Sequence, residues 1–111
     1  MSNQKIPLYP LSEDVEKVVT FKVEPIKYVN HYNTQEFHRH NYYEIFLFKD
    51  GSGHHFIDFN KHEICGGSVH FVSPGQIHQV NRAPKTSGIV LMFTSDFVYN
   101  NLESRELIVN M

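Results

Sequence analysis

Two histidines and a glutamate that could bind a metal ion lie close together within residues 37–49. His38 and His40 are two residues apart, and Glu44 follows four residues later. Alternate side chains of a β-strand point to one face, and residues two apart are separated by about 7 Å of backbone rise. Both imidazoles could therefore reach one ion, with the carboxylate of Glu44 on the same face. Imidazole nitrogens and a carboxylate suit a divalent ion such as Zn, Ni, Fe, Mn or Cu.

A fourth candidate ligand, His78, follows a predicted tight turn at residues 73–76. We predict a metal site made of His38, His40, Glu44 and His78. The alternative is that these groups bind one another and water at the mouth of a pocket, because histidine is a common polar side chain at such positions. In both cases the polar side chains on this face must have binding partners, since burying unpaired imidazoles and a carboxylate costs several kcal/mol.

Tyr42 has the same strand parity as these histidines and adds a hydroxyl group to their face. We predict that it binds a polar ligand together with His38, His40, Glu44 and His78. The alternative is a core tyrosine whose hydroxyl has one partner.

The other histidines and the cysteine have no comparable spacing. His54 and His55 follow a predicted turn with opposite parities, and we expect both at the rim of the fold. Cys65 has no motif histidine near it, so it is not predicted to be a nucleophile. Three histidines are expected to be surface residues or hydrogen-bonded fillers: His31, His62 and His70. Five phenylalanines are predicted to form the core: Phe46, Phe48, Phe56, Phe71 and Phe93.

A hydrophobic period of two, interrupted by glycine and proline turns, predicts an all-β fold. The predicted strands are residues 20–24, 37–49, 54–59, 62–65, 68–72, 77–81 and 89–94. The last one is a continuous apolar run and is predicted to be buried on both faces. Asn60 and Lys61 are predicted to form a two-residue hairpin turn. Short strands with such turns are typical of a β-sandwich or barrel.

The two ends of the chain differ from this pattern. Residues 1–19 are irregular and form a predicted N-terminal arm, in which Ser12 caps a helical turn over residues 13–18. The apolar residues of the arm should pack over another part of the fold. Residues 20–94 are the predicted barrel, and residues 95–111 begin a helical segment with Ser95 as its N-cap. The apolar residues of that segment have helical spacing: Phe97, Val98, Leu102, Leu107 and Ile108.

The composition describes one small soluble domain. The chain has 111 residues, of which 41% are hydrophobic and 20% charged, and its net charge of −2 offers no electrostatic footprint for nucleic acid. No apolar run approaches the ~20 residues of a membrane helix, and residues 1–10 lack the layout of a secretion signal. The single cysteine, Cys65, excludes an internal disulfide and is compatible with the reducing cytoplasm.

The spacing of the candidate ligands resembles the two motifs of the cupin family. The first motif reads His-x-His, three or four residues, Glu, six residues, Gly, and it is matched by His38, His40, Glu44 and Gly51. The second reads Gly, five residues, Pro-x-Gly, two residues, His, three residues, Asn. The chain has the same spacing up to His78: Gly67, five residues, Ser73-Pro74-Gly75, two residues and His78. The resemblance implies a double-stranded β-helix, also called a jelly-roll barrel.

Three positions depart from the cupin motifs. Ser73 replaces the motif proline, Arg82 stands where the terminal asparagine belongs, and Tyr32 stands where a glycine should open the first motif. None of these changes removes a candidate ligand. They weaken the expectation that the metal chemistry of enzymatic cupins is preserved.

Residues 38–97 further resemble the N-terminal effector-binding domain of AraC-type transcriptional regulators. The similar blocks are HRHNYYEIF at 38–46, GSGHHFIDF at 51–59, SPGQIHQ at 73–79 and LMFTSDF at 91–97. The resemblance implies a bacterial regulator, not an enzyme, whose barrel binds a small-molecule effector such as a sugar. A flexible N-terminal arm and C-terminal helices would pass the signal to paired helix-turn-helix units in a homodimer. Residues 1–111 lack those units, so the chain is expected to be a fragment that does not bind DNA by itself.

The alternative is a stand-alone metal-dependent cupin enzyme, such as a dioxygenase or sugar isomerase. There the three histidines and Glu44 would hold an ion with open positions for substrate. A further alternative is a binding module with an empty, vestigial site. The reading frame beyond Met111 should contain two helix-turn-helix patterns in a regulator and a stop codon in a stand-alone enzyme.

Overall fold

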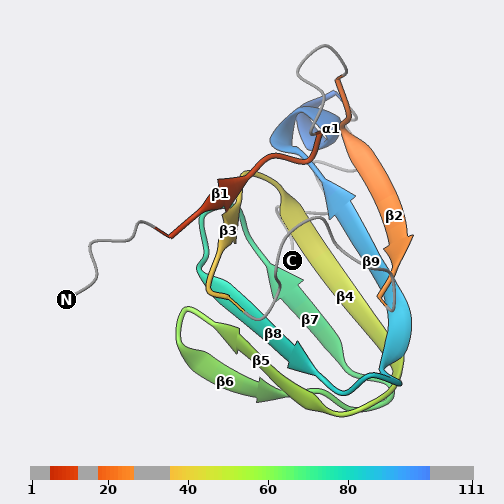
Figure 1. Cartoon of the computed structure of the whole chain (residues 1–111). Coiled ribbons are helices and arrows are strands. Elements are labelled where there is room, and N and C mark those ends of the chain that lie inside the picture. The colour runs from red at the N-terminus through yellow and green to blue at the C-terminus, as the bar shows by residue number, and fades with distance from the viewer. Residues whose placement is uncertain (1–5, 13–17, 27–35, 101–111) are drawn as a thin grey trace, which may run out of the picture.

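The computed structural model describes residues 6–12, 18–26 and 36–100, which form an all-β domain with one short helix (Figure 1). The strands are β1 (Leu8–Tyr9), β2 (Phe21–Pro25), β3 (Arg39–His40), β4 (Tyr43–Asp50), β5 (Gly53–Ile57), β6 (Asn60–Glu63), β7 (Val69–Val72), β8 (His78–Arg82) and β9 (Ser87–Phe93). The helix α1 (Ser95–Tyr99) follows the last strand. The predicted fold class is confirmed. No helix in these residue ranges is both long and apolar enough to span a membrane.

The strands form two larger antiparallel sheets and one small parallel pair. One sheet has the order β2-β9-β4-β7, and the other has the order β6-β5-β8. β1 pairs in parallel with β3, and the two lie together at the upper left of Figure 1. Neighbouring strands come from distant parts of the chain, so side chains far apart in the sequence meet between the sheets.

The inward face of residues 38–48 follows the predicted alternation, although the predicted strand is not continuous. Asn41 and Tyr42 form a bend that separates β3 from β4. The side chains at even positions are nevertheless all buried: His38, His40, Tyr42, Glu44, Phe46 and Phe48. The bend lets β3 pair with β1, while β4 pairs with β7 and β9. The prediction of one strand over residues 37–49 is therefore wrong, but its prediction of the inward face is confirmed.

The hairpin turn between β5 and β6 lies at Asp58 and Phe59, two residues before the predicted position. Their φ angles are +50° and +66°, as a two-residue turn with both central residues left-handed requires. Aspartate tolerates this region better than most residues. The Asp58 carboxylate also accepts hydrogen bonds from the Ile77 backbone N–H at 3.2 Å and from the Gln76 side chain at 2.8 Å. These bonds explain why the turn forms there.

The apolar core fills the space between the two larger sheets. It consists of Leu11, Ile26, Tyr42, Phe46, Phe48, Ile57, Ile64, Val72, Val80, Val90 and Met92. The predicted burial of Phe46, Phe48 and Phe93 is confirmed. Phe56 is only half-buried, and Phe71 is exposed, because each alternates with inward-facing neighbours on its strand.

The outer face of the four-stranded sheet is also apolar. Phe21, Val23, Val69, Phe71 and Ile89 are all exposed. The prediction that residues 89–94 are buried on both faces is wrong at Ile89, which points outward from β9 opposite Leu47 of β4. The apolar run at residues 89–94 therefore contributes to an apolar outer surface as well as to buried positions.

The ends of the barrel agree with the predictions only in part. The N-cap of α1 is Thr94, whose hydroxyl accepts from the Phe97 N–H at 3.3 Å, and the predicted cap Ser95 is the first helical residue. Most of the predicted helical turn at residues 13–18, most of the loop at 30–36 and the apolar stripe after residue 100 lie outside the described residues. The predicted packing of the arm is confirmed by Leu11, which belongs to the apolar core.

Candidate metal centre

Backbone hydrogen bonds hold His38 beside His78. The N–H of each residue donates to the carbonyl oxygen of the other, at 3.0 and 2.9 Å. The N–H of Gly75 donates to the carbonyl of His40 at 2.9 Å. Gly75 has a φ of +83°, a conformation that glycine adopts without a Cβ clash. The turn before β8 is therefore tied to β3, and the three histidines meet.

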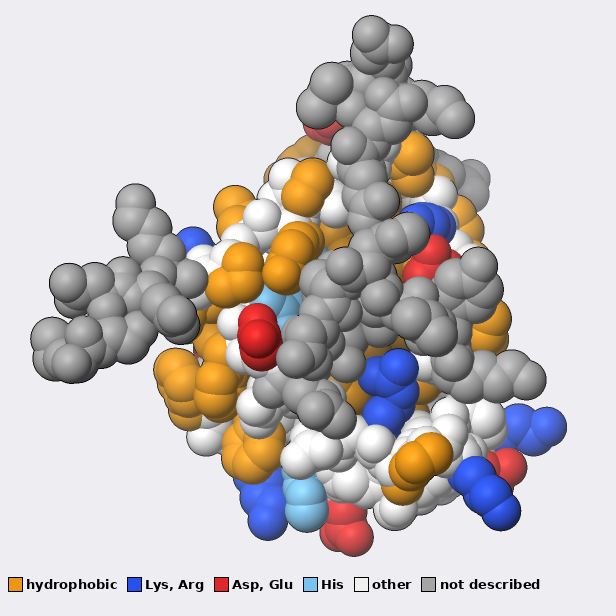
Figure 2. Space-filling model, in the orientation of Figure 1, with side chains coloured by type: hydrophobic (Ala, Val, Ile, Leu, Met, Phe, Trp, Pro, Cys, Tyr) orange, Lys and Arg blue, Asp and Glu red, His pale blue; other side chains and the backbone are white. Residues whose placement is uncertain are grey.

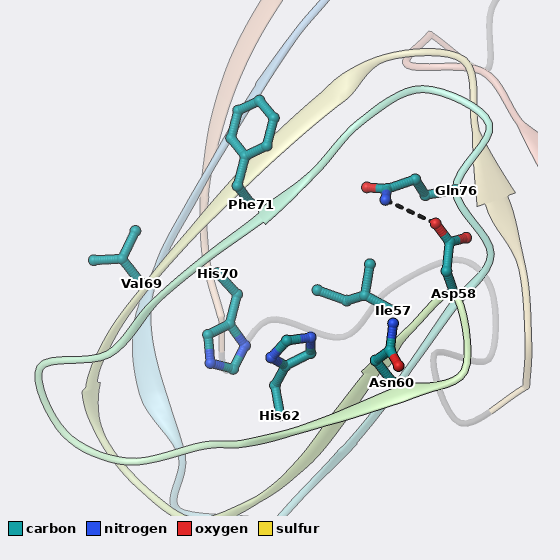
Figure 3. Close-up of a pocket in the computed structure, with 8 residues that line it drawn as sticks. All are labelled: Ile57, Asp58, Asn60, His62, Val69, His70, Phe71 and Gln76. Atoms are coloured by element: carbon teal, nitrogen blue, oxygen red, sulfur yellow. Dashed lines mark hydrogen bonds between the residues drawn. The ribbon is translucent and has the colours of Figure 1, made fainter. Parts of the chain in front are cut away.

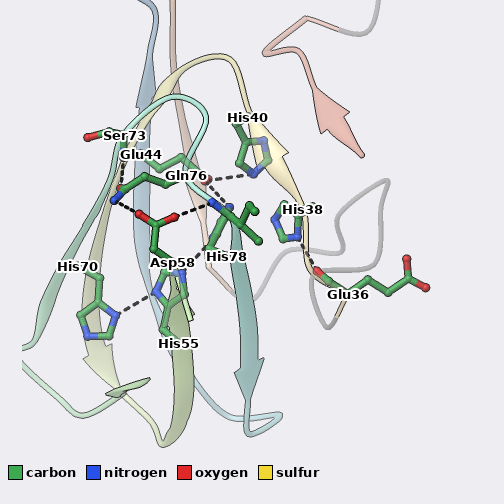
Figure 4. A network of polar contacts seen from close by, with 11 residues as sticks. Glu36, His38, His40, Glu44, His55, Asp58, His70, Ser73, Gln76 and His78 are labelled. Carbon is green, nitrogen blue, oxygen red and sulfur yellow. Dashed lines mark hydrogen bonds and ion pairs between the residues drawn. The ribbon is translucent and has the colours of Figure 1, made fainter. Parts of the chain in front are cut away.

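The three imidazoles form a compact, buried group (Figure 4). One ring nitrogen from each of His38, His40 and His78 lies within 4.8 Å of the other two, and each residue is 1% exposed. Nδ1 of His38 donates to the carbonyl oxygen of Glu36 at 2.7 Å, so that the lone pair of His38 is on Nε2. These three residues could together hold a metal ion.

Glu44 contacts two of the three histidines. Its Oε1 lies 3.1 Å from Nε2 of His40 and 3.3 Å from Nε2 of His78, and Glu44 is 3% exposed. Among the described residues, Oε1 of Glu44 and Nε2 of His78 have no hydrogen-bond partner, although both atoms are buried. A buried oxygen and nitrogen that face each other without a hydrogen bond would both be satisfied by a cation between them. The structure brings the four predicted residues together, and the three histidines among them could hold a metal ion.

Burial sets the charge state of this site. Desolvation, reinforced by the like charge of His38, lowers the pKa of His40 to about 3. Burial also lowers the pKa values of His38 and His78. The imidazoles are therefore neutral at pH 7, which is the form that binds metal. Burial raises the pKa of Glu44 to about 8, so this carboxyl group keeps its proton at pH 7 unless a cation lies nearby.

Tyr42 lies next to the metal centre. Its ring centroid is 4.5 Å from that of His40, and the residue is 3% exposed. Tyr42 also belongs to the apolar core, so its ring lies between that core and the histidines of the metal centre. Its predicted role in ligand binding stays a prediction.

The N-terminal arm covers the site through Tyr9. The Tyr9 ring centroid is 5.9 Å from that of His38 and 6.1 Å from that of His40. Two backbone hydrogen bonds fix β1 in this place: the Arg39 N–H donates to Pro7 at 2.8 Å, and the Asn41 N–H donates to Tyr9 at 3.2 Å. Little histidine surface is visible on the face shown in Figure 2. A ligand that reaches the histidines from the side of the arm must displace it.

The sequence interpretation missed His55. It was expected at the rim, but its side chain is fully buried, because on β5 it shares the inward parity of Ile57. The apolar Ile57 two residues later is the signal that could have revealed this. His55 contacts Nδ1 of His78 through Nε2 and Nδ1 of His70 through Nδ1, both at 3.0 Å. We call His38, His40, Glu44, His55, His70 and His78 the polar cluster.

The other histidines and the cysteine differ in burial, and of these only His70 belongs to the polar cluster among the described residues. His70 is buried and hydrogen-bonded, in agreement with one of its two expected states. His54 is half-buried, His62 is exposed on β6, and Cys65 is an exposed free thiol. His31 lies outside the described residues.

A cavity of about 280 Å³ opens beside His70 (Figure 3), and its lining includes none of His38, His40, Glu44 and His78. His62 and His70 face each other there with ring centroids 5.9 Å apart. The cavity is lined by Ile57, Asp58, Asn60, His62, Val69, His70, Phe71 and Gln76.

Comparisons with known proteins extend these observations. The family model described as the AraC-like ligand binding domain matches residues 24–107. A search of curated proteins finds no match. A cupin protein from Bacteroides fragilis is similar with a TM-score of 0.52 and 20% identity, over 70% of this chain and 69% of that one. A protein from Photorhabdus luminescens is similar with a TM-score of 0.51 and 16% identity, over 96% of this chain and 99% of that one. At these identities the structures show the fold alone, and they confirm the predicted cupin architecture.

Proposed function

Because this chain belongs to the family of AraC-like ligand-binding domains, we propose that it is the effector-sensing domain of a bacterial AraC-type transcriptional regulator. In this proposal the chain is not an enzyme. It binds a small molecule in the barrel and controls DNA binding by helix-turn-helix units outside residues 1–111. The full regulator would be a cytoplasmic homodimer that contacts DNA only through those units.

The observation that carries this proposal is the convergence of three neutral, buried imidazoles beside Glu44. Side chains of this kind destabilise a barrel interior unless they bind something. We propose that His38, His40, His78 and Glu44 hold one divalent ion, Zn, Ni, Fe or Mn. Such an ion, when bound, would supply a Lewis-acidic position for an oxygen atom of the effector.

The chemistry around the site favours a hydroxyl-rich effector such as a sugar. Tyr42 can add its hydroxyl group to the imidazoles, and the ring of Tyr9 provides an aromatic wall on the side of the arm. An effector between Tyr9 and His38 would contact the arm directly. It would then shift the population of arm arrangements by its better contacts with one of them.

A stand-alone metal-dependent cupin enzyme, a dioxygenase or sugar isomerase, is the second candidate. The donor set of three imidazoles and one carboxylate favours it, because such a set can leave positions open for substrate. The gene sequence after codon 111 separates the two candidates. Two helix-turn-helix patterns support the regulator, and a stop codon supports the enzyme.

Calorimetric titration with Zn²⁺ tests the proposed site. We expect one ion per chain in the unaltered protein and a loss of affinity of at least about 100-fold in His40→Ala, because a ligand is removed. His54→Ala is the matched control, since His54 lies on β5 outside the polar cluster, and its affinity should not change. Circular dichroism confirms that both variants are folded. Unchanged zinc binding by folded His40→Ala would rule out this site.

A further inference from the structure

His55 connects the metal centre to the opposite sheet through two hydrogen bonds between imidazoles. Its Nε2 lies 3.0 Å from Nδ1 of His78, and its Nδ1 lies 3.0 Å from Nδ1 of His70 (Figure 4). His55 and His78 belong to the sheet β6-β5-β8, whereas His70 is on β7 of the other sheet. The chain His78–His55–His70 thus runs across the barrel interior.

Aromatic rings enclose this chain of imidazoles. Phe46 packs edge-on against His55 with ring centroids 4.8 Å apart, and Phe48 packs in the same way against His70 at 4.9 Å. Burial lowers the pKa values of all three histidines, to about 3 for His55. Each ring is therefore neutral at pH 7 and carries one proton on one of its two nitrogens.

Counting protons leaves two hydrogen-bond arrangements for this chain of three imidazoles. Each nitrogen–nitrogen contact needs a single proton, since two protons would clash and none would leave two lone pairs facing each other. If Nδ1 of His78 carries the proton, then Nδ1 of His55 and Nε2 of His70 must carry theirs. If instead Nε2 of His78 carries it, every proton in the chain moves to the other nitrogen of its ring. The three tautomers change together.

The end of the imidazole chain at Glu44 favours the first arrangement. Nε2 of His78 faces Oε1 of Glu44 at 3.3 Å and must keep a lone pair if it is to bind an ion. The single proton of the neutral His78 ring is then on Nδ1, which donates to Nε2 of His55.

We propose that His55 and His70 are positioning residues that hold His78 as the Nδ1–H tautomer, with the lone pair of Nε2 directed at the proposed metal site. The inference rests on the proposed function, because it assigns a purpose to His78 as a ligand. It also goes further. It extends the support of the metal site along the hydrogen bonds to His70, which lines the cavity between β6 and β7.

Substitutions at His55 test the positioning role. His55→Phe keeps a ring beside Phe46 but removes both hydrogen bonds, and we expect zinc affinity to fall about 10- to 100-fold, as for other partners of metal-bound histidines. His55→Gln should restore affinity to within about threefold of the unaltered protein. Its amide can accept from Nδ1 of His78 and donate to Nδ1 of His70. His54→Phe is the matched control on the outward side of β5. Wild-type zinc affinity in folded His55→Phe would overturn the proposal.

Nitrogen-15 NMR of the histidine side chains gives a second readout that needs no variant. Protonated and bare ring nitrogens have well-separated shifts, so the direction of the chain can be observed in the unaltered protein. We expect protons on Nδ1 of His78, Nδ1 of His55 and Nε2 of His70, both without and with Zn²⁺. The opposite set of tautomers would overturn the proposal even if His55→Phe does not fold.

The two experiments separate this proposal from the proposed function. If the unaltered protein binds no Zn²⁺, the proposed metal site fails, and the NMR measurement still decides the direction of the chain. If it binds Zn²⁺ with equal affinity in wild type and His55→Phe, only the positioning role fails.

Discussion

The polar cluster and the apolar core share one barrel interior but contribute to it in opposite ways. Along the inward face of β4, Glu44 belongs to the polar cluster, and Phe46 and Phe48, two and four residues later, belong to the apolar core. Burying each phenylalanine stabilises the fold by roughly 1.5–3 kcal/mol. Burying Glu44 beside neutral imidazoles destabilises it, as the raised pKa of this carboxyl group indicates.

This difference separates the residues that build the barrel from those that give it a function. A barrel interior filled only with the apolar core would be more stable than the one observed. The polar cluster comes from β3, β4, β5, β7 and β8, so five strands converge on a destabilising arrangement. We expect such a site only if a bound ligand offsets the unfavourable free energy of burying these polar groups. For this reason we assign the function of the domain to the polar cluster.

The largest expected effect is on the apolar core. Phe48→Ala removes a 3%-exposed ring and should lower the free energy of unfolding by about 3–5 kcal/mol, because a cavity is left behind. Phe71→Ala is the matched control, since Phe71 is 36% exposed and its loss should cost about 1 kcal/mol or less. Urea denaturation measures both. Equal losses would show that the apolar core is not where the structure places it.

A smaller effect is expected when the pH changes the protonation of the polar cluster. The free energy of unfolding should fall both below and above about pH 6.5. His40 and His55 have pKa values near 3 in the folded chain and about 6.5 when unfolded, so the unfolded chain takes up their protons first and stability falls as the pH drops below 6.5. Glu44 has a raised pKa of about 8 against 4.5, so it lowers stability progressively as the pH rises from 4.5 to about 8. Metal-free protein should therefore be most stable near pH 6.5, changing by about 1.4 kcal/mol per pH unit for each proton.

Urea denaturation in the presence of a chelator measures this profile between pH 4 and pH 9. Glu44→Gln is the matched control, because glutamine has nearly the same shape and does not ionise. It should remove the decline on the alkaline side and steepen the fall between pH 6.5 and pH 4.5, because Glu44 offsets one histidine proton in that range. A stability that stays constant or rises between pH 6.5 and pH 8 in the unaltered protein would contradict the buried state of Glu44.

The smallest expected effect concerns the arm over the polar cluster. Tyr9→Ala removes the ring beside His38 and His40 but leaves the backbone pairing of β1 intact, so stability should change by about 1 kcal/mol or less. Zinc should be released to a chelator several-fold faster, because the site is less covered. Tyr99→Ala, at an exposed position of α1, is the control. An unchanged release rate in Tyr9→Ala would show that this ring does not limit access.

The sequence predicted which side chains meet better than it predicted the path of the backbone. Period-two alternation placed His38, His40 and Glu44 on one face because it depends only on parity, and parity survives the bend at Asn41 and Tyr42. The position of His78 was predicted from motif spacing. The burial of His55 was missed because it depends on how β5 packs against the other sheet. The shifted hairpin turn was missed because hydrogen bonds from residues 76 and 77 stabilise it, and these residues are distant in the sequence.

The most direct test of the central claim is X-ray absorption spectroscopy of the zinc-loaded protein, which counts the imidazoles and oxygen atoms around the ion. Our account predicts three imidazoles with at least one oxygen ligand, and one imidazole fewer in His78→Ala. A zinc shell with no more than one imidazole, or one that His78→Ala leaves unchanged, would contradict the account.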